Sequence, residues 1–542
     1  MLDNKFYKNN VVYQIYPRSF CDSNGDGIGD IQGIISKLPY LKDLGIGIIW
    51  LSPVYKSPNA DFGYDVSSYY DINPEYGSMG DMKELIEKAN RSGMRIVMDL
   101  VINHTSIEHE WFIKSKEKES PYRDYYFWRL GRRDNHKAPN NWQSLFADKA
   151  WKHDEKTDLW YLHLYSEEQA DLNYRNPQVI KEVEEIMKYW LSLGVYGFRM
   201  DVINNIFKTS LNDGKRRLFE TGRELYADQE GCHLLLQRFK KDVFDAKETM
   251  TIGECYRVSI AEAKRYVPNE LDMIFHFDHM YVDRRTIPVF IKKFSASRFK
   301  RILFRWQEEI EWNANYFENH DQPRSLSRFG SAKYRDESSK ALAMFLLTLR
   351  GTSFIYQGEE IGMANHTFNR VDEFKDVLSI NVFNTLKNKL HYSESKALKI
   401  VNDIGRDNAR TPMRWNSSNG GGFSTGVPWL PFSQNSAGVN VSDQENNPDS
   451  ILSFYKALIR IKKEHSALCL GDFHPLHTRG NLISYARNYL GSEYQVVINL
   501  GSKAVPNPLF IRGRVLLSNY GRDDYEKIDR LLPYECALIK LR

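Results

Sequence analysis

Short apolar stretches alternate with helix-like stretches along most of the chain. Each apolar stretch is rich in β-branched and aromatic residues and has the length of a strand. Eight strands that alternate with helices predict an α/β fold, a closed (β/α)8 barrel of the TIM type. The expected strands are 11–16, 46–51, 95–101, 195–201, 250–254, 270–277, 315–318 and 353–356.

The helix before the fourth strand fixes where that strand begins. Asn176 is placed to cap the helix and Pro177 suits its first turn. Gly194 is placed to end it. The chain must then enter the strand that ends at Asp201. The apolar positions with helical spacing are Val179, Val183, Ile186, Met187, Trp190 and Leu191.

Two long stretches interrupt the alternation. Residues 104–175 are rich in Trp, Tyr, Asn and charge, and predict a subdomain inserted after the third strand. Residues 362–434 predict an irregular insertion after the eighth strand. Both leave the carboxyl face of the barrel, where they would wall an active site. The barrel domain is expected at 1–103 and 176–475.

The tail of the chain has a different pattern. Short strand-like runs at 482–486, 494–498 and 514–517 predict a C-terminal antiparallel β-sandwich domain over 476–542. A chain of 542 residues exceeds one ordinary domain, so a barrel with attachments is a natural partition.

Charge and composition exclude several partners. The net charge of +4 comes from 74 basic and 70 acidic residues, too even for a nucleic-acid or anionic-membrane partner. No apolar run is long enough for a membrane span, and the polar start has no signal-peptide core. We therefore expect a cytoplasmic protein with reduced thiols. Its scattered cysteines are Cys21, Cys232, Cys255, Cys469 and Cys536.

Three carboxylates stand at or just after predicted strand ends. Asp201 and Glu254 end the fourth and fifth strands, and Asp321 follows the seventh. A lone acidic residue is normally a solvated surface charge. Three of them at strand ends in apolar surroundings instead indicate a carboxylate-driven active site at the mouth of a barrel.

The stretches around these carboxylates resemble the conserved stretches of the α-amylase family of glycoside hydrolases, family thirteen. They occur in the family's order and together are highly specific. A further stretch, QADLN at 169–173, resembles the one that marks the oligo-1,6-glucosidase branch. The matching stretches are DLVINH at 99–104, GFRMD at 197–201, GE at 253–254 and NHD at 319–321.

The resemblance implies a retaining glycosidase that acts on α-glucosides. Asp201 would be the nucleophile and Glu254 the general acid/base, with their carboxyl groups about 5–5.5 Å apart. Asp321 would steady the distorted sugar and its developing positive charge. Arg199 lies on the same face of the strand as Asp201 and should keep it ionised.

The resemblance also implies a pocket for one terminal glucose. Asp61 and Tyr64 match the residues that floor this pocket, and Asp61 would pair with Arg406. Such a bridge blocks the non-reducing side and makes the enzyme exo-acting. The alternative for His104 and His320 is packing in the core or ligation of zinc. No set of three or four zinc ligands can be assembled from the sequence. The remaining expected sugar contacts are His104, Gln169 and His320, with Phe146 and Tyr165 as aromatic walls.

Val202 follows the nucleophile directly. In this branch of the family a Val at that position accompanies preference for α-1,6 bonds. Its β-branched side chain would narrow the leaving-group side. The alternative is that Val merely suits a strand end. The expected activity is therefore hydrolysis of α-1,6-linked glucose from the non-reducing end of isomalto-oligosaccharides. The protein is expected to be a monomer.

A loop near the start has the spacing of a calcium site. Oxygen ligands fall at positions one, three, five and nine, with a backbone carbonyl at position seven. Gly33 stands where a complete EF-hand has Glu. The branch carries a similar loop with one structural Ca²⁺, and no organic cofactor is expected. The alternative is a loop of Asx turns without metal. The expected ligands are Asp22, Asn24, Asp26, Ile28 and Asp30.

Some residues depart from the branch pattern near the leaving-group side. Ala170 stands where many oligo-1,6-glucosidases have Pro, a variant also found in trehalose-6-phosphate hydrolases. Glu318 stands where an uncharged residue is common, and CYR at 255–257 replaces the usual residues after the acid. The identity of the leaving group is therefore the least constrained part of the prediction.

Two other enzyme activities remain open, and a third alternative is a homologue without catalytic activity. A trehalose-6-phosphate hydrolase needs cations for a phosphate, and Arg257, Arg324 and Arg328 are candidates. A sucrose isomerase or transglucosylase would use the same covalent intermediate with a sugar acceptor. A non-enzymatic binding homologue is disfavoured because all three carboxylates are present.

Overall fold

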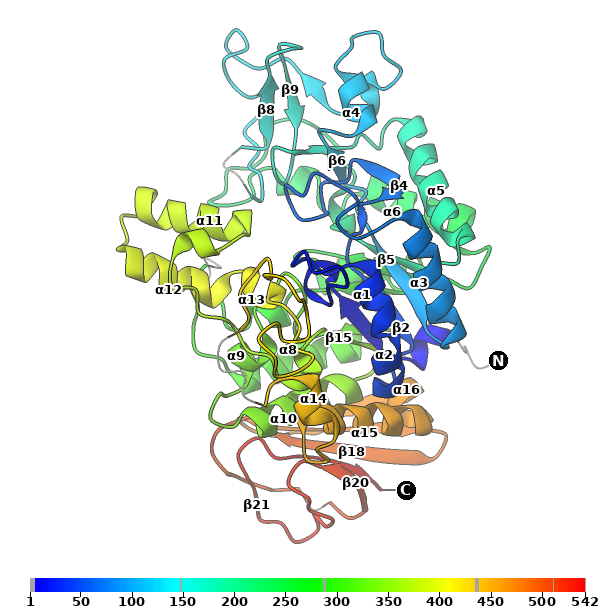
Figure 1. Ribbon diagram of the computed structural model, residues 1–542, viewed down its shortest axis with the longest axis vertical. Coiled ribbons are helices and arrows are strands. Elements are labelled where there is room, and N and C mark those ends of the chain that lie inside the picture. The colour runs from blue at the N-terminus through cyan, green and yellow to red at the C-terminus, as the bar shows by residue number, and fades with distance from the viewer. Residues whose placement is uncertain (1–4, 147–148, 286–288, 434–437, 510, 542) are drawn as a thin grey trace. The chain divides into compact units, whose positions relative to one another are not determined.

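The computed structural model describes residues 5–146, 149–285, 289–433, 438–509 and 511–541 (Figure 1). Its strands confirm the predicted (β/α)8 barrel. Eight strands lie in one sheet, in the order β13, β12, β11, β5, β2, β1, β15 and β14. These strands are β1 (Val12–Ile15), β2 (Ile48–Leu51), β5 (Arg95–Leu100), β11 (Gly197–Met200), β12 (Met250–Glu254), β13 (Met273–Phe275), β14 (Ala314–Asn315) and β15 (Thr352–Tyr356).

Contacts divide the chain into two compact units. The first comprises Met1–Trp50, Lys88–Arg95 and Phe277–Arg542, and the second Leu51–Glu87 and Ile96–His276. This division does not follow the predicted domain limits, which stay predictions. Residue 434, where the second insertion was expected to end, and residues 1–4 lie outside the described residues.

The second unit contains the strands that carry the first two carboxylates. β11 pairs in parallel with β5 on one side and with β12 on the other. Arg199 lies level with Asp99 of β5 in this register. Gly197 allows the close approach of β12, because a Cβ there would lie 1.9 Å from the carbonyl oxygen of Met250.

The predicted helix before β11 is confirmed as α5 (Pro177–Ser192). The Asn176 side chain accepts a hydrogen bond from the Gln178 N–H and caps it. All six apolar positions predicted for its buried face are buried. Gly194 follows with a positive φ of 99° and redirects the chain into the strand.

The segment after the third strand has small sheets of its own. β6 (His104–Ser106) pairs antiparallel with β10 (Gln169–Asp171). A second, three-stranded sheet has the order β7, β9, β8. The remaining elements of this unit are β3 (Tyr55–Lys56), β4 (Ser68–Ile72), β7 (Trp128–Arg129), β8 (Trp151–Asp154), β9 (Leu159–Leu162), α3 (Met79–Arg91), α4 (Glu110–Ser115), α6 (Glu230–Phe239) and α7 (Ile260–Tyr266).

The first unit combines its barrel strands with helices and the C-terminal sheet. β1 and β14 each pair in parallel with β15. Its helices are α1 (Ile31–Ser36), α2 (Leu38–Leu44), α8 (Ala296–Glu309), α9 (Ser325–Phe329), α10 (Arg335–Thr348), α11 (Val377–Asn384), α12 (Glu394–Ile404), α13 (Asp407–Arg410), α14 (Val441–Glu445), α15 (Ile451–Glu464) and α16 (Ser466–Leu470).

The stretch expected to be irregular, 362–434, is partly helical, which corrects the prediction. It contains α11, α12 and α13, seen in yellow in Figure 1. The Asp376 side chain caps α11 and the Ser393 side chain caps α12. These helices are short, and the Gly- and Pro-rich residues that follow them dominated the sequence pattern.

The tail forms an antiparallel β structure, as predicted. A five-stranded sheet has the order β16, β17, β18, β22, β20, and β19 pairs with β21 (red in Figure 1). One apolar core draws residues from both sheets, among them Val497 of β18 and Leu531 of β21. The strands are β16 (Asp472–Pro475), β17 (Leu482–Tyr489), β18 (Ser492–Asn499), β19 (Val505–Pro506), β20 (Arg514–Ser518), β21 (Arg530–Leu531) and β22 (Cys536–Lys540).

Two of the strand ends that differ from the prediction precede predicted catalytic carboxylates. β11 ends at Met200, so Asp201 is the first residue after the strand. β14 ends at Asn315, so Asp321 lies in a loop six residues further on.

The five cysteines are free and buried. Within the described part of the chain, no helix is long and apolar enough to cross a membrane.

Candidate active site

One guanidinium group in the second unit binds three carboxylates. Arg199 Nη1 donates to Asp99 Oδ1 and to Asp201 Oδ1, each at 2.7 Å, and Nη2 donates to Glu254 Oε2 at 2.6 Å. All four residues are buried. The three strands β5, β11 and β12 are neighbours, so their carboxyl ends bring these side chains to one point.

The carboxyl groups outnumber the cation that holds them. Burial raises the pKa of Asp201 well above its usual value, Arg199 opposes this, and Glu254 and Asp99 raise the pKa further. Burial likewise raises the pKa of Asp99 to about 6. One guanidinium therefore does not offset the burial of three neighbouring carboxyl groups, and the pKa values of Asp201 and Asp99 stay raised.

Val202 has a strained backbone. Its φ and ψ are both 39°, in the left-handed region that a β-branched residue rarely adopts. The Val202 N–H donates to Glu254 Oε2 at 3.2 Å, so this conformation helps to orient the acid. Val202 lies outside β11, two residues after its last residue, and its role in linkage preference stays a prediction.

Four predicted sugar contacts lie together in the second unit. Gln169 Nε2 donates to the Tyr64 carbonyl at 3.0 Å and to Asp61 Oδ2 at 3.3 Å. His104 Nε2 lies 3.0 Å from the same carbonyl. Burial lowers the pKa of His104 to about 4, so its ring is neutral near pH 7. The Tyr64 hydroxyl donates to Asp99 Oδ2 at 3.1 Å and links this group to the Arg199 cluster.

The two predicted aromatic walls also contact each other. The rings of Phe146 and Tyr165 lie edge to face, with centroids 5.5 Å apart. Asn205 Nδ2 donates to the Tyr165 hydroxyl at 3.0 Å. Val202 belongs to the same apolar cluster as both rings. The residue next to the nucleophile is thus packed against the aromatic residues predicted to line the pocket.

The third carboxylate lies in the first unit and is held by two arginines. Asp321 Oδ1 accepts from Arg406 Nη1 at 3.2 Å and from Arg410 Nη2 at 3.0 Å. His320 Nε2 lies 3.3 Å from Asp321 Oδ2. The other nitrogen of His320, Nδ1, lies 2.7 Å from Gln14 Nε2, which fixes the ring. His320 and Asp321 are therefore oriented by buried neighbours.

Two residues that hold this group were not predicted. Arg406 also binds Asp376, with Nε 2.9 Å from Oδ1. Although burial opposes it, Arg406 and Arg410 lower the pKa of Asp376. The spacing of Arg406 and Arg410, four residues apart on a helix, could have indicated Arg410. No sequence signal marks Asp376. The predicted bridge between Asp61 and Arg406 joins residues of different units and stays a prediction.

The predicted calcium loop is a series of Asx turns. Asp22 Oδ1 accepts from two backbone N–H groups, and Oδ2 accepts from Gly27 and from the Ser424 hydroxyl. Asn24 and Asp26 each accept the N–H two residues on, and Asp30 caps α1. The candidate metal ligands in this loop are all oxygen atoms, which suits Ca²⁺. Among the described residues, however, no three His, Cys, Asp or Glu side chains converge as a metal site.

The three arginines considered for a phosphate are each paired with a carboxylate. Arg257 Nη1 lies 2.8 Å from Glu220 Oε2, and Arg328 Nη2 lies 2.7 Å from Asp283 Oδ1. Arg324, fully buried, lies 3.0 Å from Glu318. Their charges are thus already balanced by partners of the chain.

The chain is similar to known proteins over its whole length. The family model of the alpha amylase catalytic domain matches residues 14–471. An oligo-1,6-glucosidase of Parageobacillus thermoglucosidasius is 43% identical, and the alignment covers 100% of both chains.

Two solved structures extend the comparison. Trehalose-6-phosphate hydrolase of Bacillus licheniformis is 40% identical with a TM-score of 0.92, covering 99% of this chain and 100% of that one. Isomaltulose synthase of Klebsiella sp. LX3 is 36% identical with a TM-score of 0.95, covering 100% of both chains. One fold therefore carries enzymes named for different reactions.

Proposed function

Because the chain belongs to the α-amylase family of glycoside hydrolases, we propose that it is a retaining, exo-acting α-glucosidase. It releases α-1,6-linked glucose from the non-reducing end of isomalto-oligosaccharides. The observation that carries the proposal is the Arg199 cluster, which joins Asp201 to Glu254. The full-length similarity to oligo-1,6-glucosidases supports the substrate class.

The reaction follows from the chemistry of the two carboxyl groups. Asp201 attacks the anomeric carbon while Glu254 donates its proton to the glycosidic oxygen, and the C–O bond to the leaving sugar breaks. Water, deprotonated by Glu254, then attacks the glucosyl ester and restores both groups. Asp321, held by Arg406 and Arg410, stabilises the positive charge of the sugar in both steps.

The guanidinium that Asp201 and Glu254 share supports retention over inversion. A retaining glycosidase holds its two carboxyl groups about 5–5.5 Å apart, whereas an inverting one holds them about 6.5–9.5 Å apart to leave room for a water molecule. Here one guanidinium donates to both carboxyl groups, which keeps them close to each other.

The phosphate alternative has less support. A phosphate dianion needs cations that are not already neutralised. Arg257, Arg324 and Arg328 are all engaged with carboxylates. The relatives named as trehalose-6-phosphate hydrolases keep this activity as the second candidate.

One substrate panel tests the proposal. The purified protein is incubated with isomaltose, isomaltotriose, maltose, sucrose, trehalose and trehalose-6-phosphate, and glucose and new disaccharides are measured. We expect rapid glucose release from isomaltose and isomaltotriose. Cleavage of trehalose-6-phosphate alone would replace the proposal by the second candidate. Conversion of sucrose to another disaccharide would indicate an isomerase.

Val202 gives a prediction on linkage preference. Val202→Ala removes two methyl groups next to the nucleophile and widens the leaving-group side. We expect the ratio of maltose to isomaltose hydrolysis, compared as kcat/KM, to rise. Val202→Thr keeps the branched shape but adds polarity, and should move the ratio in the same direction. An unchanged ratio in both variants would remove the linkage role.

We also propose that the loop of Asp22, Asn24, Asp26, Ile28 and Asp30 binds one structural Ca²⁺. Its oxygen-only donors and nine-residue spacing support this. Such a site would depend in part on the neutral oxygens of Asn24 and Ile28. The loop contacts Ser424 and Phe423, so a bound ion would hold two distant segments of the first unit together.

Calcium should raise thermal stability. At a hundredfold excess over Kd, bound Ca²⁺ adds about 2.7 kcal/mol to the free energy of unfolding. We expect Tm to be higher in CaCl2 than in EGTA, measured by scanning calorimetry. Asp26→Asn keeps the turn to Ile28 but loses the charge, and should lose the calcium response with little change in EGTA. Equal Tm values for the parent protein would favour the metal-free loop.

We further propose that the protein acts as a monomer in the cytoplasm. The five free, buried cysteines support a reducing compartment. Size-exclusion chromatography with light scattering tests the monomer, and fractionation of cells tests the location.

A further inference from the structure

Glu318 forms a buried ion pair with Arg324, and these two residues flank the loop that carries Asp321. Its side chain is 1% exposed, and its Oε1 lies 3.0 Å from Nη1 of the fully buried Arg324. Its other oxygen accepts the backbone N–H of Ser325. The partners stand three residues before and three residues after Asp321. The pair therefore closes the loop 319–323 at its base.

Arg324 also reaches the helix whose arginines hold Asp321. Its Nη1 donates to the Gln357 carbonyl at 2.6 Å, and its Nη2 donates to the Ala409 carbonyl at 3.1 Å. Ala409 lies in α13, between Arg406 and Arg410. One side chain thus connects the base of the Asp321 loop, the end of β15 and the arginine-bearing helix.

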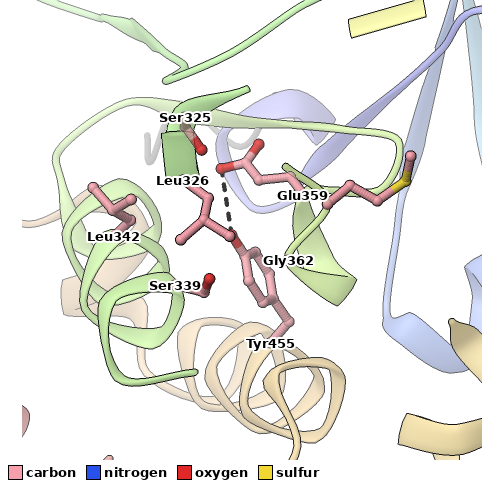
Figure 2. Close-up of a pocket in the computed structure, with 8 residues that line it drawn as sticks. Ser325, Leu326, Ser339, Leu342, Glu359, Gly362 and Tyr455 are labelled. Atoms are coloured by element: carbon pink, nitrogen blue, oxygen red, sulfur yellow. Dashed lines mark hydrogen bonds between the residues drawn. The ribbon is translucent and has the colours of Figure 1, made fainter. Parts of the chain in front are cut away.

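A neighbouring acid, Glu359, has hydrogen-bond partners of its own. Glu359 accepts from the Tyr455 hydroxyl at 3.3 Å (Figure 2). It also accepts from the Tyr356 N–H at 3.2 Å. Burial and the charge of Glu318 raise the pKa of Glu359 well above its usual value. The cavity beside it, also lined by Ser339, is about 10 Å³, room for one water and far too small for a sugar.

We propose that Glu318 is a positioning residue for hydrolysis, acting through Arg324 to hold Asp321 against Arg406 and Arg410. This inference rests on the proposed function, in which Asp321 stabilises the charged sugar. Glu318 has no room to contact substrate itself, because its side chain is buried and both of its oxygens are engaged. Its carboxylate balances the guanidinium charge and fixes the direction of the fork.

A double-mutant cycle tests the inference. Glu318→Gln, Asp321→Asn and the double variant are compared with the parent on 4-nitrophenyl α-D-glucoside. A displacement of about 1 Å at a reacting group can cost about a hundredfold in rate. We expect Glu318→Gln to lower kcat between about tenfold and a hundredfold with KM changed less than about twofold. In the Asp321→Asn background the same change should have almost no further effect.

Controls separate positioning from folding. Glu359→Gln changes another buried carboxyl of the first unit, whose oxygens accept from Tyr356 and Tyr455, and should keep kcat. Circular dichroism and Tm verify that each variant is folded. If Glu318→Gln does not fold, Arg324→Lys replaces it, because a lysine keeps the charge but cannot reach the Gln357 and Ala409 carbonyls together.

The outcomes are distinct. Equal fold-losses for Glu318→Gln with and without Asp321→Asn would overturn the positioning role. Unchanged kcat in a folded Glu318→Gln variant would do the same. Near-normal activity of Asp321→Asn would instead contradict the role of Asp321 in the proposed function.

Discussion

Replacing Asp201 by Asn should lower kcat/KM on isomaltose by about 10⁴-fold or more, because the amide cannot form the glucosyl ester. Asp201 Oδ1 is fixed by Arg199 at 2.7 Å, and Asn can keep a hydrogen-bonding position there. The lower rate would therefore reflect the loss of the nucleophilic carboxylate rather than a change in the structure of the site. Initial rates of glucose release, with thermal melts to verify folding, measure it.

Glu254→Gln should show a different pattern that identifies the acid. The amide cannot protonate the leaving oxygen, so isomaltose hydrolysis should fall by about 10²–10⁴-fold. 4-Nitrophenol leaves without protonation, so the loss in the first step should be much smaller on 4-nitrophenyl α-D-glucoside. Azide can then replace water in the second step, and the product should be the retained α-glucosyl azide.

A surface carboxylate of the same unit provides the matched control. Asp158 is 77% exposed, and its Oδ1 lies 3.0 Å from His153 Nε2. Asp158→Asn makes the same chemical change as Asp201→Asn and should leave the rate within about twofold of the parent, as for most surface substitutions. Near-normal turnover in either Asp201→Asn or Glu254→Gln would refute the roles assigned to them.

The fold could be predicted from the sequence because its signals are local. Asn176, Pro177 and Gly194 mark the limits of α5, and the apolar spacing between them gives its buried face. Once that helix is placed, the strand that follows must begin near Val195. Asp201 and Glu254 then fall at neighbouring strand ends by topology alone.

The details of the site depended on contacts that no local pattern carries. Asp376 and Arg406 are 30 residues apart, and Arg324 links Glu318 to the arginine-bearing helix. The left-handed backbone of Val202 could not be predicted either, because its sequence context resembles an ordinary strand end. Strain of this kind is tolerated only where surrounding packing imposes it, and it often marks functional positions.

Arg199→Met should reduce activity nearly as strongly as loss of the nucleophile. One guanidinium donates to Asp99, Asp201 and Glu254. Removing one preorganised donor from an active site costs about 10²–10³-fold in kcat. Arg199→Met removes the hydrogen-bond donors to both Asp201 and Glu254, so we expect kcat to fall by about 10³-fold or more.

The pH dependence gives the more specific test of Arg199. Burial raises the pKa of Asp201 and Arg199 lowers it, so loss of the guanidinium raises that pKa further. Asp201 must be ionised to attack, and activity is therefore lost as pH falls through its pKa. The acid limb of kcat/KM should move to higher pH in Arg199→Met. Arg199→Lys keeps the charge without the fork, and should move the limb less while kcat still falls.

Arg238→Lys is the control for removing an arginine fork from the second unit. Arg238 is 43% exposed and pairs with Glu184 at 2.6 Å and with Asp242 at 3.6 Å, which are not part of the Arg199 cluster. Loss of a buried ion partner can cost about 3–5 kcal/mol in stability, so Tm must be measured for every variant. A folded Arg199→Met enzyme with an unmoved acid limb would show that burial alone, without the guanidinium, sets the ionisation of Asp201.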